Sequence, residues 1–263
     1  VPLSSFTYHF GFHSAVAVFH WLSGMEVMDA TLWVGQLMNC FAVFSLYALI
    51  KQLEPEKKWA GLVAILIAGL ALIFPIFLVN WGRFTQLTGQ VVLPTTLIFL
   101  IGLVRTEKFD WKLILLTALS LAGLALTHYR VLLLGALLIP VIFIFNLKKE
   151  TFKVHFWALA ASGVLAFLMF LPWFLHVFQG GYDEIVISQL SATTGQPILK
   201  TYFNAFSHYY PDWVWLTCLI ATLYGVTKKK VSIILVLIWA VMLFLILNPA
   251  WVGLPGDGVI DDL

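Results

Sequence analysis

Long apolar segments without a central charge most restrict how this chain can fold. The 263 residues are 61% hydrophobic and only 11% charged, with a mean hydropathy of +0.96. The apolar runs have the length of helices, whereas an outer-membrane barrel would show alternating segments of roughly ten residues. We therefore expect an integral membrane protein of the all-α class, a polytopic transmembrane helical bundle.

About eight spans are predicted in this bundle, together with one outer interfacial helix. The spans fall at about 30–50, 59–79, 89–104, 112–127, 131–147, 154–177, 211–226 and 231–248. Kinks are expected at the prolines inside or near the span ends, which are Pro75, Pro94, Pro140 and Pro172. The sequence offers no segment for a soluble domain, so residues 1–263 are expected to form a single membrane domain.

The connections between spans alternate between the two sides of this topology, and lysine and arginine are concentrated on one side. Twelve of the fifteen lie in the first, third, fifth and seventh connections, within residues 51–58, 105–112, 148–153 and 228–230. The opposite side holds the other three, Arg83, Arg130 and Lys200. Basic connections stay in the cytoplasm, so this bias predicts a multi-pass protein of the cytoplasmic (plasma) membrane. Topology alone explains the basic inner face, and no nucleic-acid partner is expected.

Most polar and aromatic loop residues lie on the predicted outer side. Residues 6–24 are expected to form an interfacial helix there, and residues 177–210 a long outer loop. At 100° per residue, His9, His13 and His20 fall within about 40° of one another. This stripe is expected to face the outer aqueous side, so that a functional site would face outward.

The three outer cations oppose the charge bias and therefore suggest an anionic partner. Arg83, Arg130 and Lys200 are candidates for binding the phosphate or diphosphate of a substrate, because guanidinium groups match phosphate oxygens. The alternative is that each side chain snorkels to the interface and pairs with an acid on that side.

Histidines provide a second set of candidates. His9 and His13 are four residues apart, a spacing that would allow both to contact one divalent cation or a substrate. His128, beside Arg130, is a further candidate contact. The alternative is that each is an ordinary hydrogen-bonding histidine at the surface or between helices.

Three acids are candidates for catalysis. Glu26 precedes the first span, and Asp183 and Glu184 follow two glycines in the long outer loop. A transferase would need a carboxylate as general base, and others would be needed if Mg²⁺ or Mn²⁺ were a cofactor. The alternative is that these acids cap helices or remain solvated loop charges.

Residues 8–13 read Tyr-His-Phe-Gly-Phe-His. They are followed by an apolar helix, a short acidic loop and a long span. This segment resembles the Y-P-x-G-x-H or Y-P-x-x-x-H stretch of the GT-C membrane glycosyltransferases and their relatives. The segments WGRFTQL, LTHYRVLLL and GLPGDGVIDD also resemble outer-loop segments of such proteins.

The resemblance implies a GT-C-like fold and the transfer of a sugar from a polyprenyl-phosphate carrier, at the outer face, to a lipid, glycan or protein. It further implies that Arg83 and Arg130 face the lipid phosphate. The metal or sugar would be contacted by His9, His13, Asp183 and Glu184. In this family the catalytic acid lies early in the first outer loop, a part that would precede Val1. The chain is therefore expected to be a fragment, with the base outside it.

Two alternatives to an enzyme remain. A flippase or transporter of a lipid-linked glycan would use polar groups within the spans, for which Gln36 and Asn39 are candidates. The absence of charged residues from the span centres disfavours an ion-coupled transporter. A non-catalytic scaffold subunit would leave the outer histidines and arginines scattered, whereas an enzyme or a flippase would bring them together.

Overall fold

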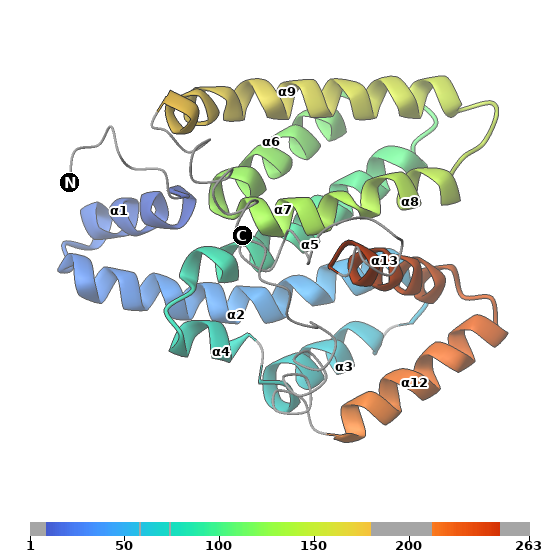
Figure 1. Ribbon diagram of the computed structural model, residues 1–263, viewed down its shortest axis with the longest axis horizontal. Coiled ribbons are helices and arrows are strands. Elements are labelled where there is room, and N and C mark those ends of the chain that lie inside the picture. The colour runs from blue at the N-terminus through green and yellow to red at the C-terminus, as the bar shows by residue number, and fades with distance from the viewer. Residues whose placement is uncertain (1–8, 58, 74, 180–211, 248–263) are drawn as a thin grey trace, which may run out of the picture. The chain divides into compact units, whose positions relative to one another are not determined.

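A computed structural model of the chain describes residues 9–57, 59–73, 75–179 and 212–247 (Figure 1). Within these ranges every regular element is a helix and no strand occurs, as the apolar runs predict. The chain divides into two compact units, Val1–His176 and Val177–Leu263.

The first unit begins with a short helix and a long one, α1 (Gly11–Ser23) and α2 (Val27–Leu53). It continues with α3 (Ala60–Leu66), the π-helix η2 (Ile67–Ala71), α4 (Ile76–Asn80), α5 (Phe84–Arg105), α6 (Trp111–Thr127), α7 (Tyr129–Ala136), α8 (Leu138–Phe145) and α9 (Phe152–Gln179). The helix α9 extends three residues beyond the boundary of this unit. The second unit contains α12 (Asp212–Thr227) and α13 (Val231–Leu247).

Each predicted span coincides with one helix or with a run of consecutive helices. Among the described residues, four stretches are long and apolar enough to cross a membrane: Val27–Leu53, Ala60–Asn80, Phe84–Arg105 and Phe152–Val177. The shorter apolar helices are Trp111–Thr127, Tyr129–Phe145, Asp212–Thr227 and Val231–Leu245. These helices indicate a multi-pass membrane protein.

Proline interrupts the second predicted span but not the third or the sixth. After η2 the backbone becomes extended at Leu72, and α4 starts directly after Pro75. The kink expected there is thus a complete break of the helix. By contrast, α5 and α9 continue through Pro94 and Pro172. A neighbouring helix can compensate for the hydrogen bond that an internal proline removes.

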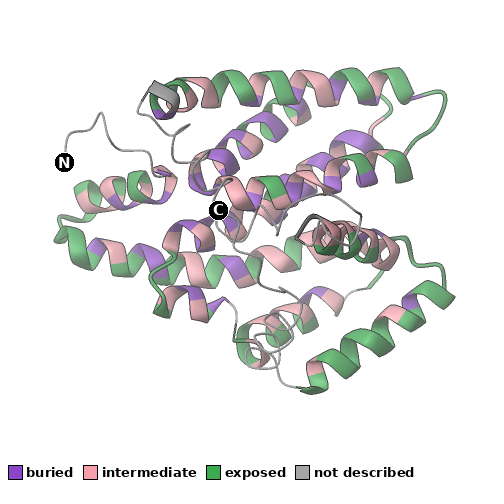
Figure 2. Cartoon of the chain, viewed as in Figure 1, coloured by how far each residue is buried: buried purple, intermediate pink, exposed green. Residues whose placement is uncertain are grey.

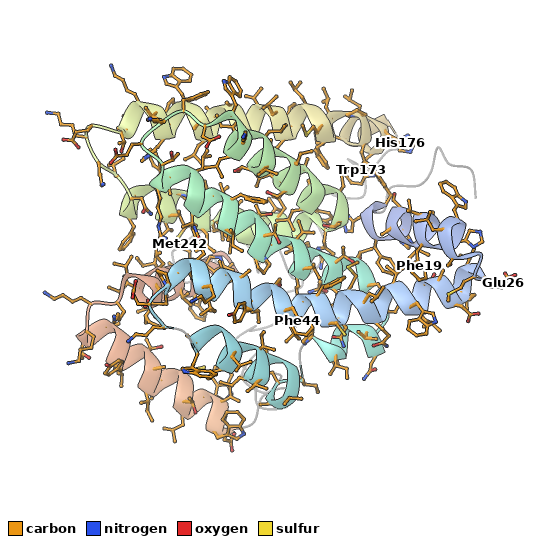
Figure 3. All side chains as sticks on the ribbon, turned by 180° about the vertical axis from the view of Figure 1, so that it is seen from behind. Phe19, Glu26, Phe44, Trp173, His176 and Met242 are labelled. Carbon is orange, nitrogen blue, oxygen red and sulfur yellow. The ribbon has the colours of Figure 1, made fainter. Side chains whose placement is uncertain are left out.

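The helix α5 is the centre of the first unit. In the most apolar stretch of α5, 56% of the residues are buried. The corresponding share is 17% in α2 and 17% in α9. Figure 2 shows the buried residues on the faces that helices turn toward one another. Large apolar side chains such as Phe44, labelled in Figure 3, and Trp33 are more than half exposed on α2. Such a surface suits contact with lipid rather than water.

Hydrogen bonds bring three basic connections to one end of this unit. Arg105 donates from Nη1 to the carbonyl of Gln52 at 3.0 Å, which links the end of α5 to the end of α2. His155 donates from Nε2 to the carbonyl of Thr106 at 2.8 Å, which links α9 to the α5–α6 connection. The first, third and fifth connections therefore lie together, as the concentration of cations in these connections predicts. We call this the basic end.

Candidate functional site

Gly11 determines how the opening segment enters the helical bundle. A Cβ atom at this position would lie 2.7 Å from the Cγ2 of Thr127 and 3.0 Å from the carbonyl oxygen of Leu126. Any larger residue would therefore force α1 away from the end of α6. The next residue, Phe12, is only 1% exposed and stacks on Phe84 at the start of α5, with ring centroids 5.2 Å apart. The glycine and the phenylalanine thus dock α1 on two other helices.

His128 is the single residue between α6 and α7. Its backbone is extended, with φ −166° and ψ 102°. Its N–H donates to the carbonyl of Leu124 at 2.9 Å, and its own carbonyl accepts from the N–H of Leu132 at 3.1 Å. The residue thus ends one helix and begins the next, which fixes the direction of its side chain. A Cβ atom on Gly89 of α5 would lie 3.2 Å from the Cβ of His128, so α5 packs closely against this residue.

Four aromatic side chains from three parts of the sequence meet at this point, opposite the basic end. The ring centroid of His9 lies 4.8 Å from that of His128, 4.8 Å from that of Tyr129 and 6.4 Å from that of Trp173 on α9. Figure 3 labels Trp173 beside the start of α1. We call His9, His128, Tyr129 and Trp173 the histidine cluster. Its two histidines are almost completely buried.

Two buried nitrogen atoms of the histidine cluster lack a hydrogen-bond partner among the described residues. These atoms are Nδ1 of His128 and Nε1 of Trp173. Leaving a buried polar atom unsatisfied costs about 1–3 kcal/mol, so native proteins rarely do so without a reason. The two atoms therefore mark a place where a ligand or water would find ready hydrogen-bonding groups.

Burial and nearby positive charge keep both histidines neutral. Burial, the other histidine and then Arg130 and Arg83 lower the pKa of His128 to about 3. Burial, Arg130 and His13 lower the pKa of His9 to about 4. Since an ordinary histidine has a pKa near 6.5, both imidazoles are uncharged at neutral pH. Arg130 follows His128 by two residues at the start of α7, and Arg83 directly precedes Phe84, whose ring stacks on Phe12 of α1.

The two arginines provide positive charge at the edge of the histidine cluster. Arg83 immediately precedes α5 and is exposed, with its guanidinium carbon 3.8 Å from the ring centroid of Trp81. Arg130 lies in the first turn of α7 and is partly buried. Within the described ranges neither guanidinium forms an ion pair with a carboxylate. The aromatic contact orients Arg83 without neutralising it.

The prediction that His9 belongs to a helical histidine stripe is wrong, because the helix starts later than expected, whereas His13 and His20 do lie on this helix. The helix α1 begins at Gly11, so His9 precedes it and turns inward, whereas His13 in its first turn is exposed. Partial desolvation lowers the pKa of His13. His20 lies at the other end of α1, where its Nδ1 contacts the carbonyl of Met25. His9, a predicted contact for a substrate or a metal, is thus a buried side chain and not part of an exposed helix face.

The predicted acids do not join the histidine cluster within the described part of the chain. Glu26 is exposed on the turn between α1 and α2, where Figure 3 labels it. The 13 residues of α1 lie between this turn and His9, which corresponds to about 20 Å at 1.5 Å per residue. Asp183, Glu184 and Lys200 lie outside the described residues.

The described residues do not provide a complete site for a divalent metal. No group of three or more His, Cys, Asp or Glu side chains is arranged to hold a metal ion within them. His9 and His128 would supply only two nitrogen ligands, and the adjacent arginines would repel a cation. A Mg²⁺ or Mn²⁺ ion would need oxygen ligands in addition to these two nitrogen atoms.

Tyr129 and Trp173 are the members of the histidine cluster that the sequence did not single out. Trp173 follows Pro172 near the end of a span, a position where an aromatic residue is expected at the membrane interface anyway. Only the approach of α9 to the start of α1 reveals that this indole contacts His9 and Phe10.

Comparison with known proteins gives one match. Residues 3–255 match the protein family described as "Family of unknown function (DUF6541)". No curated protein and no solved structure matches the chain. Since the match covers nearly the whole length, the chain belongs to the DUF6541 family.

Proposed function

We propose that this protein is a membrane glycosyltransferase that takes a sugar from a polyprenyl-phosphate donor at the outer face of the cytoplasmic membrane. The observation that carries the proposal is the contact between the buried rings of His9 and His128, with Arg130 two residues after His128 and Arg83 directly before α5. The likeness of the Tyr-His-Phe-Gly-Phe-His segment to the GT-C enzymes agrees with it.

The arginines suit the phosphate of such a donor. In the transfer, the bond between the anomeric carbon of the sugar and the phosphate oxygen breaks, and a bond to an acceptor hydroxyl forms. The phosphate leaves with the bonding electrons and gains negative charge. Two guanidinium groups without carboxylate partners among the described residues would stabilise that charge, and they would do so more in the transition state than in the ground state.

The histidines suit a binding role rather than that of the general base. A group with a pKa of about 3, like His128, holds a proton too weakly to accept one from a hydroxyl at neutral pH. Its neutral ring can still donate or accept one hydrogen bond at Nδ1. We therefore assign His128 and Trp173 to hydrogen bonding with the phosphate or the sugar. The proton of the acceptor goes to a base that the described residues do not include.

The same arrangement supports a substrate site over a purely structural subunit. A scaffold has no need for unsatisfied nitrogen atoms beside two cations, because each such atom lowers stability. Arg83 is exposed, whereas His128 is buried. A site with one solvent-facing cation and one buried polar group suits an amphipathic substrate.

The test uses the full-length protein in proteoliposomes with radiolabelled polyprenyl-phosphate sugars and a mixture of lipid and glycan acceptors. We expect sugar transfer, and we expect Arg130→Gln to weaken donor use about tenfold or more, the effect of losing one charge-assisted contact. His128→Asn should reduce transfer as well. Lys149→Gln, which removes one exposed positive charge at the basic end, is the control and should retain full transfer.

Two results would contradict the proposal. One is the absence of transfer with every donor while the purified protein remains folded. The other is transfer that Arg83→Gln, Arg130→Gln and His128→Asn leave unchanged, which would place the site elsewhere.

A second candidate, movement of a lipid-linked glycan without bond formation, is favoured by polar atoms deeper in the bundle. Oδ1 of Asn39 on α2 and Oγ1 of Thr117 on α6 are buried without a partner among the described residues. Both residues lie near the middle of their helices. Substrate that crosses the bilayer intact in the proteoliposome assay would favour this candidate.

A further inference from the structure

A pocket at the basic end of the first unit is separate from the histidine cluster. It has a volume of about 180 Å³ and lies where α5 and α8 end and α9 begins. Its lining includes Arg105, Glu107, Phe145, Leu147, Lys148 and His155. The proposed function uses none of these residues.

The histidine of this pocket holds the surrounding segments in place. His155 is 3% exposed and donates from Nε2 to the carbonyl of Thr106 at 2.8 Å. Nδ1 of the same ring lies 3.4 Å from Oγ1 of Thr151, within hydrogen-bonding distance. Both ring nitrogens thus have a partner. The contacts fix the α5–α6 connection against α9, so the pocket is preformed.

Two cations of the pocket keep binding capacity for an anion. Arg105 uses one guanidinium donor on the carbonyl of Gln52, which leaves the other donors of its fork for a ligand. In the part of the chain that the structure describes, Arg105, Glu107 and Lys148 form no ion pair. With one acid against two bases, the lining suits an anion of single charge.

The rim of the pocket is apolar. Phe145 at the end of α8 is 41% exposed, and Leu147 is 49% exposed. They lie at the end of an apolar helix and directly before Lys148. An apolar rim beside cations, at the level where a membrane helix ends, suits a ligand that is itself amphipathic.

We propose that this pocket binds the phosphodiester headgroup of an anionic phospholipid, with phosphatidylglycerol as the chemical type. Arg105 and Lys148 contact the phosphate, while Phe145 and Leu147 contact the glycerol and the start of the acyl chains. The volume is several times the roughly 30 Å³ that one water molecule occupies in the liquid, which leaves space for a phosphate with part of its glycerol. Basic pockets between membrane helices recognise such headgroups. Charge bias predicts that the lipid comes from the cytoplasmic leaflet.

The experiment measures lipid binding to the purified full-length protein by native mass spectrometry, and thermal stabilisation by added lipid. The probes are phosphatidylglycerol, phosphatidylethanolamine and soluble sn-glycerol 3-phosphate. Lys148→Gln should weaken phosphatidylglycerol binding about tenfold, because one charge-assisted contact is lost. Lys149→Gln removes an adjacent exposed charge that does not line the pocket, and it should bind lipid like the unmodified protein.

Arg105→Gln should weaken binding as Lys148→Gln does. If the loss of its bond to Gln52 prevents folding, the comparison of Lys148→Gln with Lys149→Gln decides alone. Equal phosphatidylglycerol binding by these two variants would overturn the proposal. Equal stabilisation by phosphatidylethanolamine would overturn the preference for an anionic lipid. Stabilisation by sn-glycerol 3-phosphate that matches that of the lipid would assign the pocket to a soluble phosphate.

Discussion

The imidazole rings of His9 and His128 lie with centroids 4.8 Å apart and planes tilted by 47°, although the two residues are far apart in the sequence. The contact joins the segment before α1 to the junction of α6 and α7. Next to burial, the nearness of His9 also lowers the pKa of His128.

This histidine pair predicts that acid destabilises the protein. The folded-state pKa values, about 4 for His9 and about 3 for His128, are below the unfolded value near 6.5. The unfolded chain therefore binds more protons below pH 6.5, and stability should fall as the pH decreases from 6.5 toward 3. Below pH 6.5, each histidine should lower the free energy of unfolding by about 1.4 kcal/mol per pH unit. This loss should continue down to about pH 4 for His9 and to about pH 3 for His128. Thermal unfolding in detergent at a series of pH values measures the effect.

The double variant His9→Asn/His128→Asn should flatten this pH profile between pH 6.5 and 4. His20→Asn, on the exposed end of α1, is the control and should leave the profile unchanged. A profile with the same slope in all three proteins would show that other groups cause the acid sensitivity.

Arg130→Gln should raise the pKa of both buried histidines. The arginine contributes to lowering each value, but burial is the larger cause, so the rise should be partial. NMR titration of histidine-labelled protein would measure it. Lys149→Gln, at the basic end, should not change either value. Unchanged values in Arg130→Gln would mean that this guanidinium does not lie near the cluster.

Gly11→Ala should destabilise the protein by about 1–3 kcal/mol, the usual cost of inserting a methyl group into a packed contact. The new Cβ would meet the side chain of Thr127 and the backbone of Leu126. Gly123→Ala on α6 is the matched control, because no atom lies within 4 Å of its added Cβ. That control should be neutral or stabilising, since alanine favours a helix over glycine by about 1 kcal/mol. Equal melting temperatures of the two variants would contradict the docking of α1 on α6.

Phe12→Ala should lower stability by about 3–5 kcal/mol, because it empties a packed position. The ring packs in a cluster with Val16, Ala30 and Val34 that joins α1 to α2. Trp21→Ala on the same helix removes a side chain that is 77% exposed, and it should change the melting temperature little. Chemical unfolding in detergent compares the two, and a larger effect of Trp21→Ala would reverse the assigned faces of α1.

The sides of the membrane can be tested with single cysteines in a Cys40→Ser/Cys218→Ser background, since both native cysteines are free and exposed. A membrane-impermeant maleimide on intact cells should label Trp21→Cys and not Lys149→Cys. The opposite pattern would reverse the topology and place the histidine cluster on the cytoplasmic side.

Much of the helical architecture followed from the sequence alone. Hydropathy is a local property, so the positions of the helices and the grouping of the basic connections could be predicted without knowing any contact. Arg83 and Arg130 were identified because cations on the wrong side of a charge bias stand out in a sequence, and His128 because it is a histidine beside Arg130.

The tertiary structure decided which of these residues meet. A regular helix from residue 6 would have placed His9 and His13 on one face, but the close approach of Gly11 to α6 coincides with a later start and leaves His9 buried. Trp173 and Tyr129 join the cluster only because α9 and the α6–α7 junction reach the same place. Such contacts depend on how distant helices pack, and no periodicity within one segment encodes them.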